Sequence, residues 1–396
     1  MLQLNVGISM LCIIGLACSA PSLNLRSSLG EKDTHWVNIW TTMPQLVEPG
    51  NLPPVPFNGS DSVFQNTTIR QTLQVSLPAE EIRIRLSNTF GINALSITKV
   101  TVSLPATQQV GLSASQEGSM QVVSFNGRPN TVIPNGALAV SDPIKISVKA
   151  QSPLMISIFL EDGQEGFSIA GHPGSRTTSY LAFGDWVDAQ NITQSSVQST
   201  DHCWPDLLLK KLQKHDSTSR ISISNQAAGG NRILQDGLGP NVLSRLDRDV
   251  LAQSGVRFAM IFEGVNDIGV ADPDTASQLE IEERLIAAYR QIATRIHALG
   301  IPVFGATITP FGSSSTSDYI QPYSSPVREK TRQRINTFIR ESGIFDAVLD
   351  FDRVLRHPLA PSQLLEKYDS GDHLHPNVAG YQALADYFPL EILVES

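Results

Sequence analysis

An aspartate and a histidine near the end of the chain have the spacing of a general-base pair. Asp372 and His375 are three residues apart and lie just before a predicted helix at 377–387. At this spacing the carboxylate can accept the imidazole Nδ1–H and leave Nε2 free to take a proton. The alternative is a helix-start aspartate beside a surface histidine. His373 is expected to point elsewhere, and no metal site is predicted because no further ligand has suitable spacing.

Two upstream loops could supply hydrogen-bond donors. The segment 225–232 contains paired glycines, Gly229 and Gly230, which let a backbone N–H approach a ligand closely. The segment 263–269 contains Asn266, whose amide could donate into a cleft. An ordinary glycine turn and an Asx turn are the alternatives. Two donors and a base are the groups that handle a tetrahedral intermediate, so the three loops together predict acyl-transfer chemistry.

The elements around these loops predict an α/β domain at 204–396. Helical patterns alternate with short apolar runs there, which indicates a parallel sheet with helices on both faces. The carboxyl ends of its strands meet at one edge, where such folds bind ligands. The predicted strands are 221–224, 256–262, 302–308 and 347–351, and the predicted helices are 204–214, 285–299, 326–342 and 377–387.

The preceding part of the chain has a different pattern. Polar and apolar residues alternate in short runs between residues 36 and 187, with turn residues between the runs. This period of two predicts an all-β sandwich or jelly-roll domain. The polar segment 188–203 is rich in Ser, Gln and Thr and is predicted to be a linker.

One strand is missing from the expected α/β series. The series begins with the helix 204–214, although such a unit should open with a buried strand whose following loop holds a ligand or a nucleophile. The polar linker cannot be that strand. A buried strand contributes several kcal/mol at about 25 cal/mol per Å², so a chain folded as written should be poorly stable.

The three loops resemble conserved blocks of a known enzyme family. The segments 225–232, 263–269 and 369–377 are similar to blocks II, III and V of the SGNH (GDSL-type) hydrolases, and the resemblance extends from residue 204 to the C-terminus. It implies a flavodoxin-like α/β/α sandwich that needs no metal or organic cofactor. It also implies that the Gly230 backbone N–H and Asn266 are oxyanion donors, that His375 is the base and that Asp372 orients it. The upstream domain resembles the β-domain that some fungal and bacterial members have.

The sequence departs from this family at one block. Block I, the Gly-Asp-Ser segment with the serine nucleophile, is absent before the helix 204–214, so the nucleophile is unknown. Cys203 is a candidate replacement, although nothing marks it as an activated thiol. An omitted exon at 201–204 is the preferred explanation. A variant that has lost catalysis, or a misleading resemblance, is the alternative.

The N-terminus has the pattern of a secretory signal. An apolar run at 6–17 is followed by Cys18, Ser19 and Ala20 and is too short to span a bilayer. We expect residues 1–20 to be removed and the protein to be secreted and extracellular, with no integral membrane segment left. A buried strand is the alternative for this segment. Cys203 would then be the only thiol, so no intramolecular disulfide could form.

The charge and composition of the chain restrict the classes of partner that we expect for it. The net charge of −9 supplies no basic stripe for nucleic acid. The sequons at Asn58, Asn66 and Asn191 are compatible with a secreted glycoprotein. We therefore expect a secreted esterase for a small-molecule or glycan ester, inactive as written because its nucleophile is absent. A non-catalytic descendant that binds glycan, or a gene product without a selected function, is the alternative; the pattern leaves the oligomeric state open.

Overall fold

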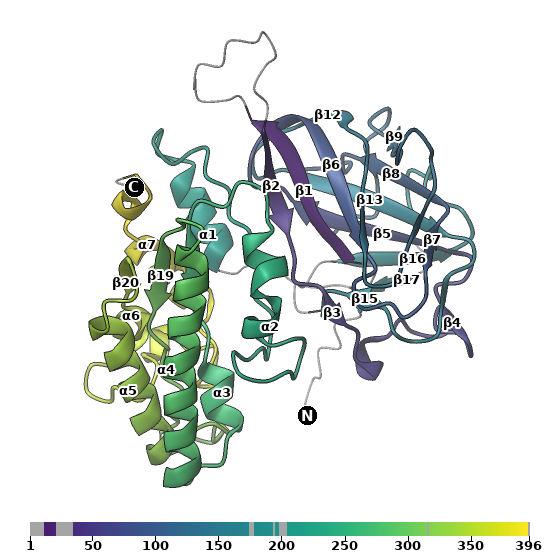
Figure 1. Cartoon of the computed structure of the whole chain (residues 1–396). Helices are drawn as coiled ribbons and strands as arrows, with labels where there is room; N and C mark the ends of the chain where they lie inside the picture. Colours follow the sequence, from purple (N-terminus) through teal and green to yellow (C-terminus); the bar gives the residue numbers. More distant parts are fainter. Residues whose placement is uncertain are drawn as a thin grey trace. The chain divides into compact units, whose positions relative to one another are not determined.

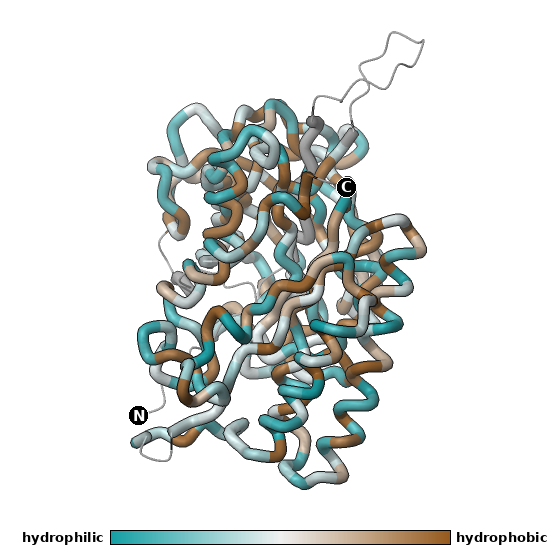
Figure 2. The backbone as a smooth tube through the Cα atoms, turned by 90° about the vertical axis from the view of Figure 1, so that its left-hand side faces the viewer, coloured by the Kyte–Doolittle hydropathy of each residue, from teal (hydrophilic) through white to brown (hydrophobic). Residues whose placement is uncertain are grey.

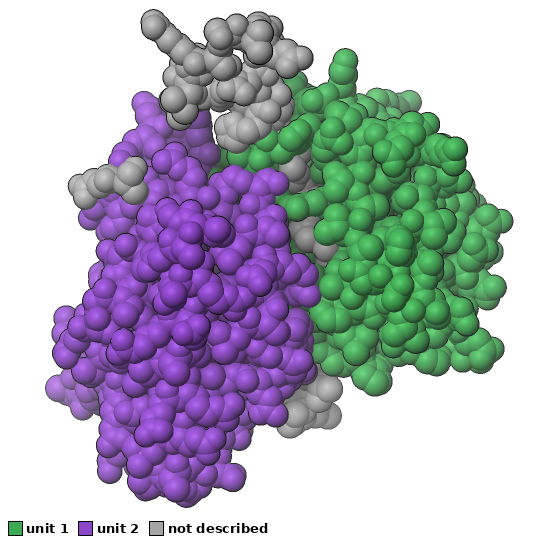
Figure 3. All heavy atoms as spheres, in the orientation of Figure 1, with its two compact units in different colours: residues 1–201, 222–229 green, residues 202–221, 230–396 purple. Residues whose placement is uncertain are grey.

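The computed structural model describes residues 12–20, 35–173, 178–192, 195–197, 204–314 and 317–394. The beginning of the predicted signal segment (1–11), part of the predicted linker (193–194 and 198–203) and Cys203 therefore lie outside the described residues. The chain forms two compact units (Figure 3). Unit 1 comprises residues 1–201 and 222–229, and unit 2 comprises residues 202–221 and 230–396.

The described part of unit 1 contains two main antiparallel sheets, several of whose strands are labelled in Figure 1. The first has the order β17-β16-β5-β13-β8-β9. Its strands are Ser195–Val197, Ser179–Phe183, Thr67–Gln74, Pro153–Leu160, Lys99–Ser103 and Gln121–Val122. The second has the order β11-β6-β1-β2, with β12 also paired to β6. Its strands are Leu138–Val140, Ala79–Ser87, Cys12–Ala20, His35–Thr41 and Ile144–Val148.

The described residues of unit 1 also form three short two-stranded antiparallel sheets. These are β3 (Gln45–Leu46) with β15 (Ala170–Gly171), β4 (Ser62–Val63) with β14 (Gln164–Glu165), and β7 (Leu95–Ile97) with β10 (Thr131–Ile133). One hydrophobic core takes side chains from both main sheets, among them Ile84 of β6, Leu73 of β5 and Ile156 of β13. Two antiparallel sheets that share a core form a β-sandwich, as the alternating pattern predicts.

Strand β5 is buried on both faces, unlike the half-exposed strand that its alternating pattern indicates. Its polar face is covered by loops that it holds through hydrogen bonds. The Arg70 guanidinium donates to the carbonyls of Ser113 and Ala189 at 2.7 and 2.6 Å, and the Thr68 hydroxyl donates to Gly184 O at 2.6 Å. The polar residues of β5 therefore face loops rather than solvent, and their hydrogen bonds to loop carbonyls satisfy them although they are buried.

The apolar N-terminal segment forms strand β1. It pairs antiparallel with both β2 and β6, so Cys12–Ala20 lies inside the second sheet. This is the arrangement expected under the alternative that the segment is a buried strand rather than a signal.

The described residues of unit 2 form three parallel strands in the order β18-β19-β20, at Ala259–Ile261, Val303–Ala306 and Ala347–Leu349. Its helices are α1 (Trp204–Leu212), α2 (Val242–Leu246), α3 (Val265–Val270), α4 (Thr275–His297), α5 (Pro326–Glu341), α6 (Phe351–Leu355) and α7 (Val378–Tyr387). Helices α4 and α5 lie side by side (Figure 1) and bury Tyr289, Ile292 and Ile335 in the core of this unit. Helix α1 packs on α7, which packs on α6, so a second helical layer exists.

The helices have the amphipathic pattern that the sequence indicates. Figure 2 shows hydrophobic and hydrophilic residues alternating along the helical turns. Side-chain caps fix two helix starts: Asp274 accepts from the Ser277 N–H before α4, and Asn377 accepts from the Gly380 N–H before α7. Within the described residues, no helix has both the length and the apolar character needed to cross a membrane.

The predicted strand 221–224 is wrong. Residues 221–228 have no regular secondary structure, and Ser222–Gly229 belongs to unit 1, where the hydroxyls of Ser222 and Ser76 lie 2.5 Å apart. The physical reason is the missing neighbour. In a flavodoxin-like sheet of order 2-1-3-4-5 the second strand pairs only with the first. Without that strand the described residues of unit 2 offer the segment no strand to pair with, and the three described strands correspond to the third, fourth and fifth positions.

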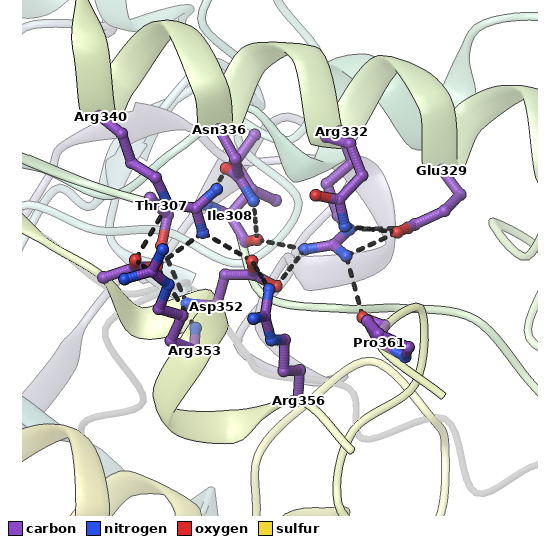
Figure 4. Close-up of polar contacts among 12 residues, drawn as sticks. Thr307, Ile308, Glu329, Arg332, Asn336, Arg340, Asp352, Arg353, Arg356 and Pro361 are labelled. Carbon is purple, nitrogen blue, oxygen red and sulfur yellow. Dashed lines mark hydrogen bonds and ion pairs between the residues drawn. The ribbon is translucent and has the colours of Figure 1, made fainter. Parts of the chain in front are cut away.

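A buried ionic cluster fastens α5 to the sheet and to α6 (Figure 4). The fully buried Arg332 donates from Nη1 to Asp352 Oδ1 at 2.6 Å and to Ile308 O at 2.8 Å. Asp352 also accepts from Arg340 and Arg356, at 2.7 and 3.2 Å. The cluster therefore joins the segment after β19 to the segment after β20, both of which carry loops of the candidate site.

Candidate active site

The loop 369–377 holds the predicted aspartate–histidine pair in hydrogen-bonding geometry. Asp372 Oδ2 lies 2.6 Å from His375 Nδ1. The other oxygen, Oδ1, accepts from the backbone N–H groups of Leu374 and His375 and from the Ser370 hydroxyl, at 3.0, 2.8 and 3.0 Å. One carboxylate thus orients both the loop backbone and the imidazole.

The surroundings of Asp372 keep it ionised. Partial burial raises the pKa of its carboxyl, but the hydrogen bonds from the His375 imidazole and from the His375 and Leu374 backbone together lower that pKa to about 2. The carboxylate can therefore accept the Nδ1–H and stabilise an imidazolium. The His375 side chain is 60% exposed, and its Nε2 has no hydrogen-bond partner among the described residues. This nitrogen is open to take a proton from a nucleophile.

The predicted oxyanion donors lie close to one another. Asn266, in the first turn of α3, donates from Nδ2 to Asn231 O at 2.9 Å, and Asn231 directly follows Gly230. Gly230 has a φ of 74°, and a Cβ there would lie 2.5 Å from the Leu238 side chain. The loop conformation therefore requires glycine at this position.

Buried side chains that the sequence did not reveal fix this loop to α3 and to α2. Asp267 accepts from the N–H groups of Ile233 and Leu234, both at 2.9 Å, and is only 2% exposed. The Asn231 amide oxygen accepts from Arg245 Nη2 at 2.8 Å. The only sequence signal for Asp267 is its position directly after Asn266. Its partners Ile233 and Leu234 lie 34 and 33 residues earlier in the chain, so the spacing gives no hint of these hydrogen bonds.

A third loop connects the two donors to the histidine loop. The Tyr323 hydroxyl donates to Asn266 Oδ1 at 3.2 Å, and the Tyr323 N–H donates to Gln321 Oε1 at 3.1 Å. Gln321 Nε2 in turn donates to Asp372 O at 3.0 Å. These contacts run through the loop after β19, for which the sequence predicts no role. Tyr323 turns the Asn266 amide so that its N–H₂ faces away from the phenol.

Each predicted site residue is held by hydrogen bonds, but the histidine loop and the two oxyanion donors are connected only through other residues. Asp372 and His375 form one pair, and Asn266 is hydrogen-bonded to Asn231, the residue after Gly230. No hydrogen bond links His375 to Gly230 or Asn266 among the described residues. The described residues also place no serine hydroxyl on His375 Nε2. His373 points elsewhere, as predicted: its Nδ1 lies 2.6 Å from Asp369 Oδ2. No cluster of metal-binding side chains occurs in the described part of the chain.

Comparison with known proteins identifies the family. The model of the GDSL-like lipase/acylhydrolase family matches residues 179–383, which is more than half of the chain. The chain therefore belongs to this family of ester hydrolases. No curated protein matches the sequence.

Several solved structures are similar to about half of the chain. A putative lipolytic protein of the G-D-S-L family from Desulfitobacterium hafniense has 21% identity over 48% of this chain and 87% of its own, with a TM-score of 0.34. An acetylxylan esterase from Geobacillus stearothermophilus has 19% identity over 48% and 80%, with a TM-score of 0.34. A GDSL-like lipase from Bacteroides thetaiotaomicron has 15% identity over 48% and 82%, with a TM-score of 0.33.

Proposed function

We propose that this chain derives from a hydrolase of carboxylic esters, with an acetyl or acyl group on a carbohydrate or lipid as its substrate class. The observation that carries the proposal is the Asp372–His375 pair, which has an oriented imidazole and an open Nε2. We further propose that this centre is inactive as written, because the segment with its serine nucleophile is absent.

The chemistry that this centre could perform follows from its groups. A serine hydroxyl would attack the ester carbonyl while His375 takes its proton, and Asp372 would stabilise the resulting imidazolium. The Gly230 N–H and the Asn266 amide would stabilise the oxyanion. Losing one such donor typically costs about 3 kcal/mol of barrier.

The test compares two chains. One is the 396-residue chain, and the other has a strand and Gly-Asp-Ser loop restored before Trp204. We expect the restored chain to hydrolyse short p-nitrophenyl esters faster than the 396-residue chain, and His375→Ala to abolish that gain. Inactivity of a folded restored chain would overturn the esterase proposal. If the unmodified chain were active and His375→Ala removed that activity, the chain would have a nucleophile at this centre and the proposed inactivity would be wrong.

A polar cleft in unit 1 supports the second candidate function, glycan binding without catalysis. The cleft has a volume of about 560 Å³, and its lining includes Asn126, Arg128, Asn130, Glu161 and Asp162. Amide and charged side chains are suited to hydrogen-bond sugar hydroxyls. Calorimetric titration with xylo-oligosaccharides tests this. Binding that Arg128→Ala weakens would support it, and the absence of heat would count against it.

Secretion and glycosylation are also proposals. The apolar segment 6–17 and the sequon at Asn66, which is exposed in the connection between β4 and β5, support them. Cleavage after Ala20 would remove β1 from the sheet of unit 1. Expression in a eukaryotic host, followed by N-terminal sequencing of protein from the medium, distinguishes the alternatives. A new N-terminus near residue 21 supports secretion, whereas an intracellular chain that retains β1 contradicts it.

A further inference from the structure

A second set of serine, histidine and aspartate side chains lies beside the predicted pair. Ser317 Oγ is 2.7 Å from His373 Nε2, and His373 Nδ1 is 2.6 Å from Asp369 Oδ2. Ser317 belongs to the loop after β19, whereas the other two residues belong to the loop 369–377. The order of contacts, hydroxyl to imidazole to carboxylate, is that of an activated serine.

The hydrogen bonds around this set fix the direction of each proton. Asp369 Oδ1 accepts from the N–H groups of Gly371 and His373, at 2.8 and 3.0 Å, so the group acts as an acceptor. Its Oδ2 then accepts the Nδ1–H of His373, which leaves Nε2 as the acceptor of the imidazole. The Tyr319 N–H donates to Ser317 Oγ at 3.3 Å. The hydroxyl hydrogen of Ser317 is therefore directed at His373 Nε2.

The backbone of His373 is held in an uncommon conformation. Its φ is 61°, in the left-handed region that residues other than glycine seldom occupy. Such a conformation costs roughly 1–3 kcal/mol and persists where the surroundings enforce it, which is frequent at functional sites. The Tyr319 ring stacks on the imidazole with a centroid distance of 6.4 Å and an interplanar angle of 28°. The strained backbone and the ring together set the imidazole toward Ser317 rather than toward Asp372.

The site is also accessible. The side chain of His373 is 24% exposed, that of Asp369 is 11% exposed, and Ser317 is partly buried. A small acyl group can therefore reach the hydroxyl while the carboxylate stays largely shielded, as in sites where an aspartate orients a catalytic imidazole.

We propose that Ser317, His373 and Asp369 form a second acyl-transfer centre, with Ser317 as nucleophile, His373 as base and Asp369 as its orienting group. Its substrates are small, activated carboxylic esters. The proposal goes beyond the function proposed above, because it uses none of His375, Asp372, Gly230 or Asn266.

The proposed reaction has two steps, formation of an acyl-serine and its hydrolysis. Ser317 Oγ forms a bond to the carbonyl carbon while its proton moves to His373 Nε2. The tetrahedral intermediate then breaks its bond to the alcohol oxygen, which leaves with that proton and yields an acyl-serine. Water adds to the acyl carbon and gives a proton to His373. The carbon–oxygen bond to Ser317 then breaks, the proton returns to Oγ, and the carboxylic acid leaves.

The test is covalent labelling of the full chain with a fluorophosphonate. Attack by the serine displaces fluoride and leaves a stable phosphonyl ester, which peptide mass spectrometry locates. We expect one adduct, on Ser317, and none on Ser317→Ala. We expect His373→Asn to slow labelling at least about 100-fold, since a positioned general base typically contributes 10²–10⁴-fold. Asparagine tolerates the left-handed region, so this variant should keep the fold.

A matched control uses Ser362, which holds the same loop through its backbone carbonyl, an acceptor for the Gly312 N–H at 2.7 Å. Ser362→Ala should label at the rate of the unmodified chain. An adduct on another serine, equal labelling of His373→Asn, or a rate no higher than that of the urea-unfolded chain would each overturn the proposal. The restored-chain assay tests the centre at His375 separately when both of its chains carry Ser317→Ala, which removes ester hydrolysis by the second centre, so the two proposals can fail independently.

Discussion

Glu263 is an ionisable residue that the structure of unit 2 keeps protonated near neutral pH. Burial raises the pKa of its carboxyl to about 8; the Arg245 charge opposes this rise and the Asp267 charge adds to it. An unfolded glutamate ionises near pH 4.3. Between those values the folded chain holds a proton that the unfolded chain has lost, so stability falls as pH rises through this window.

Glu263→Gln should remove this pH dependence, because the amide cannot ionise. We expect the free energy of urea unfolding of the unmodified chain to fall by on the order of 2 kcal/mol between about pH 5 and pH 8, after allowance for partial exposure. The variant should show a smaller fall. Glu283→Gln, an exposed position in α4, is the control and should behave like the unmodified chain. If the free energy of unfolding depended on pH equally in Glu263→Gln and in the unmodified chain, the carboxyl of Glu263 would not be protonated in the folded chain.

His172, in unit 1, makes the stability of the chain depend on pH with the opposite sign. Burial lowers the pKa of its imidazole from 6.5 to about 4, and its ring lies beside Gln71. Below pH 6.5 the unfolded chain takes up a proton that the folded chain refuses, so stability is lost as pH falls toward 4. We expect a loss of about 3 kcal/mol over this window. Urea unfolding of His172→Gln should show a flatter acid limb, whereas the exposed His215→Gln should not.

At the scale of residues, the sequence could predict pairs that are close in the chain. The spacing of Asp372 and His375 indicates their hydrogen bond, which the structure contains. The Ser317–His373 contact joins residues 56 positions apart and depends on a left-handed backbone at His373. No spacing rule predicts that conformation, so the contact between His373 and Ser317 could not be predicted.

At the scale of elements, the attachment of α5 depends on its buried arginine. Arg332 is 0% exposed and pairs with Asp352, which is also 0% exposed. Arg332→Met should destabilise unit 2 by about 3–5 kcal/mol, because it leaves buried acceptors without this partner. Arg334→Met removes an exposed arginine on the same helix, paired with Glu282, and should cost less than about 1 kcal/mol. Urea unfolding measures both, and similar losses would contradict a special role for the cluster.

Elements with a strong internal pattern were predictable, and one that depends on a partner was not. The predicted helix 326–342 corresponds to α5 at Pro326–Glu341, where the apolar period and the Ser325 cap are local signals. The predicted strand 221–224 has equally suitable residues, but a strand exists only when it pairs. Its expected neighbour is the missing first strand, so its sequence alone could not decide its structure.

At the scale of the whole molecule, the sheet that the described residues of unit 2 form ends at β18, where a doubly wound fold would place its first strand. An exposed strand edge presents unpaired backbone groups. The Ala259 N–H donates to Pro302 O at 3.0 Å, on the side of β19. Because N–H groups alternate in direction along a strand, the Met260 N–H points to the opposite edge. That amide is the one that a restored first strand would pair.

Hydrogen exchange at this amide therefore tests whether the chain lacks a strand that its fold requires. In the unmodified chain the Met260 amide should exchange faster than its neighbour Ile261, whose N–H faces β19. Restoring the segment before Trp204 should slow exchange at Met260 by at least about tenfold and leave that at Ile261 within a few-fold, because a paired buried amide exchanges only upon opening. Mass spectrometry with fragmentation to single residues measures both. Equal protection of Met260 in the two chains would mean that no strand position is vacant beside β18.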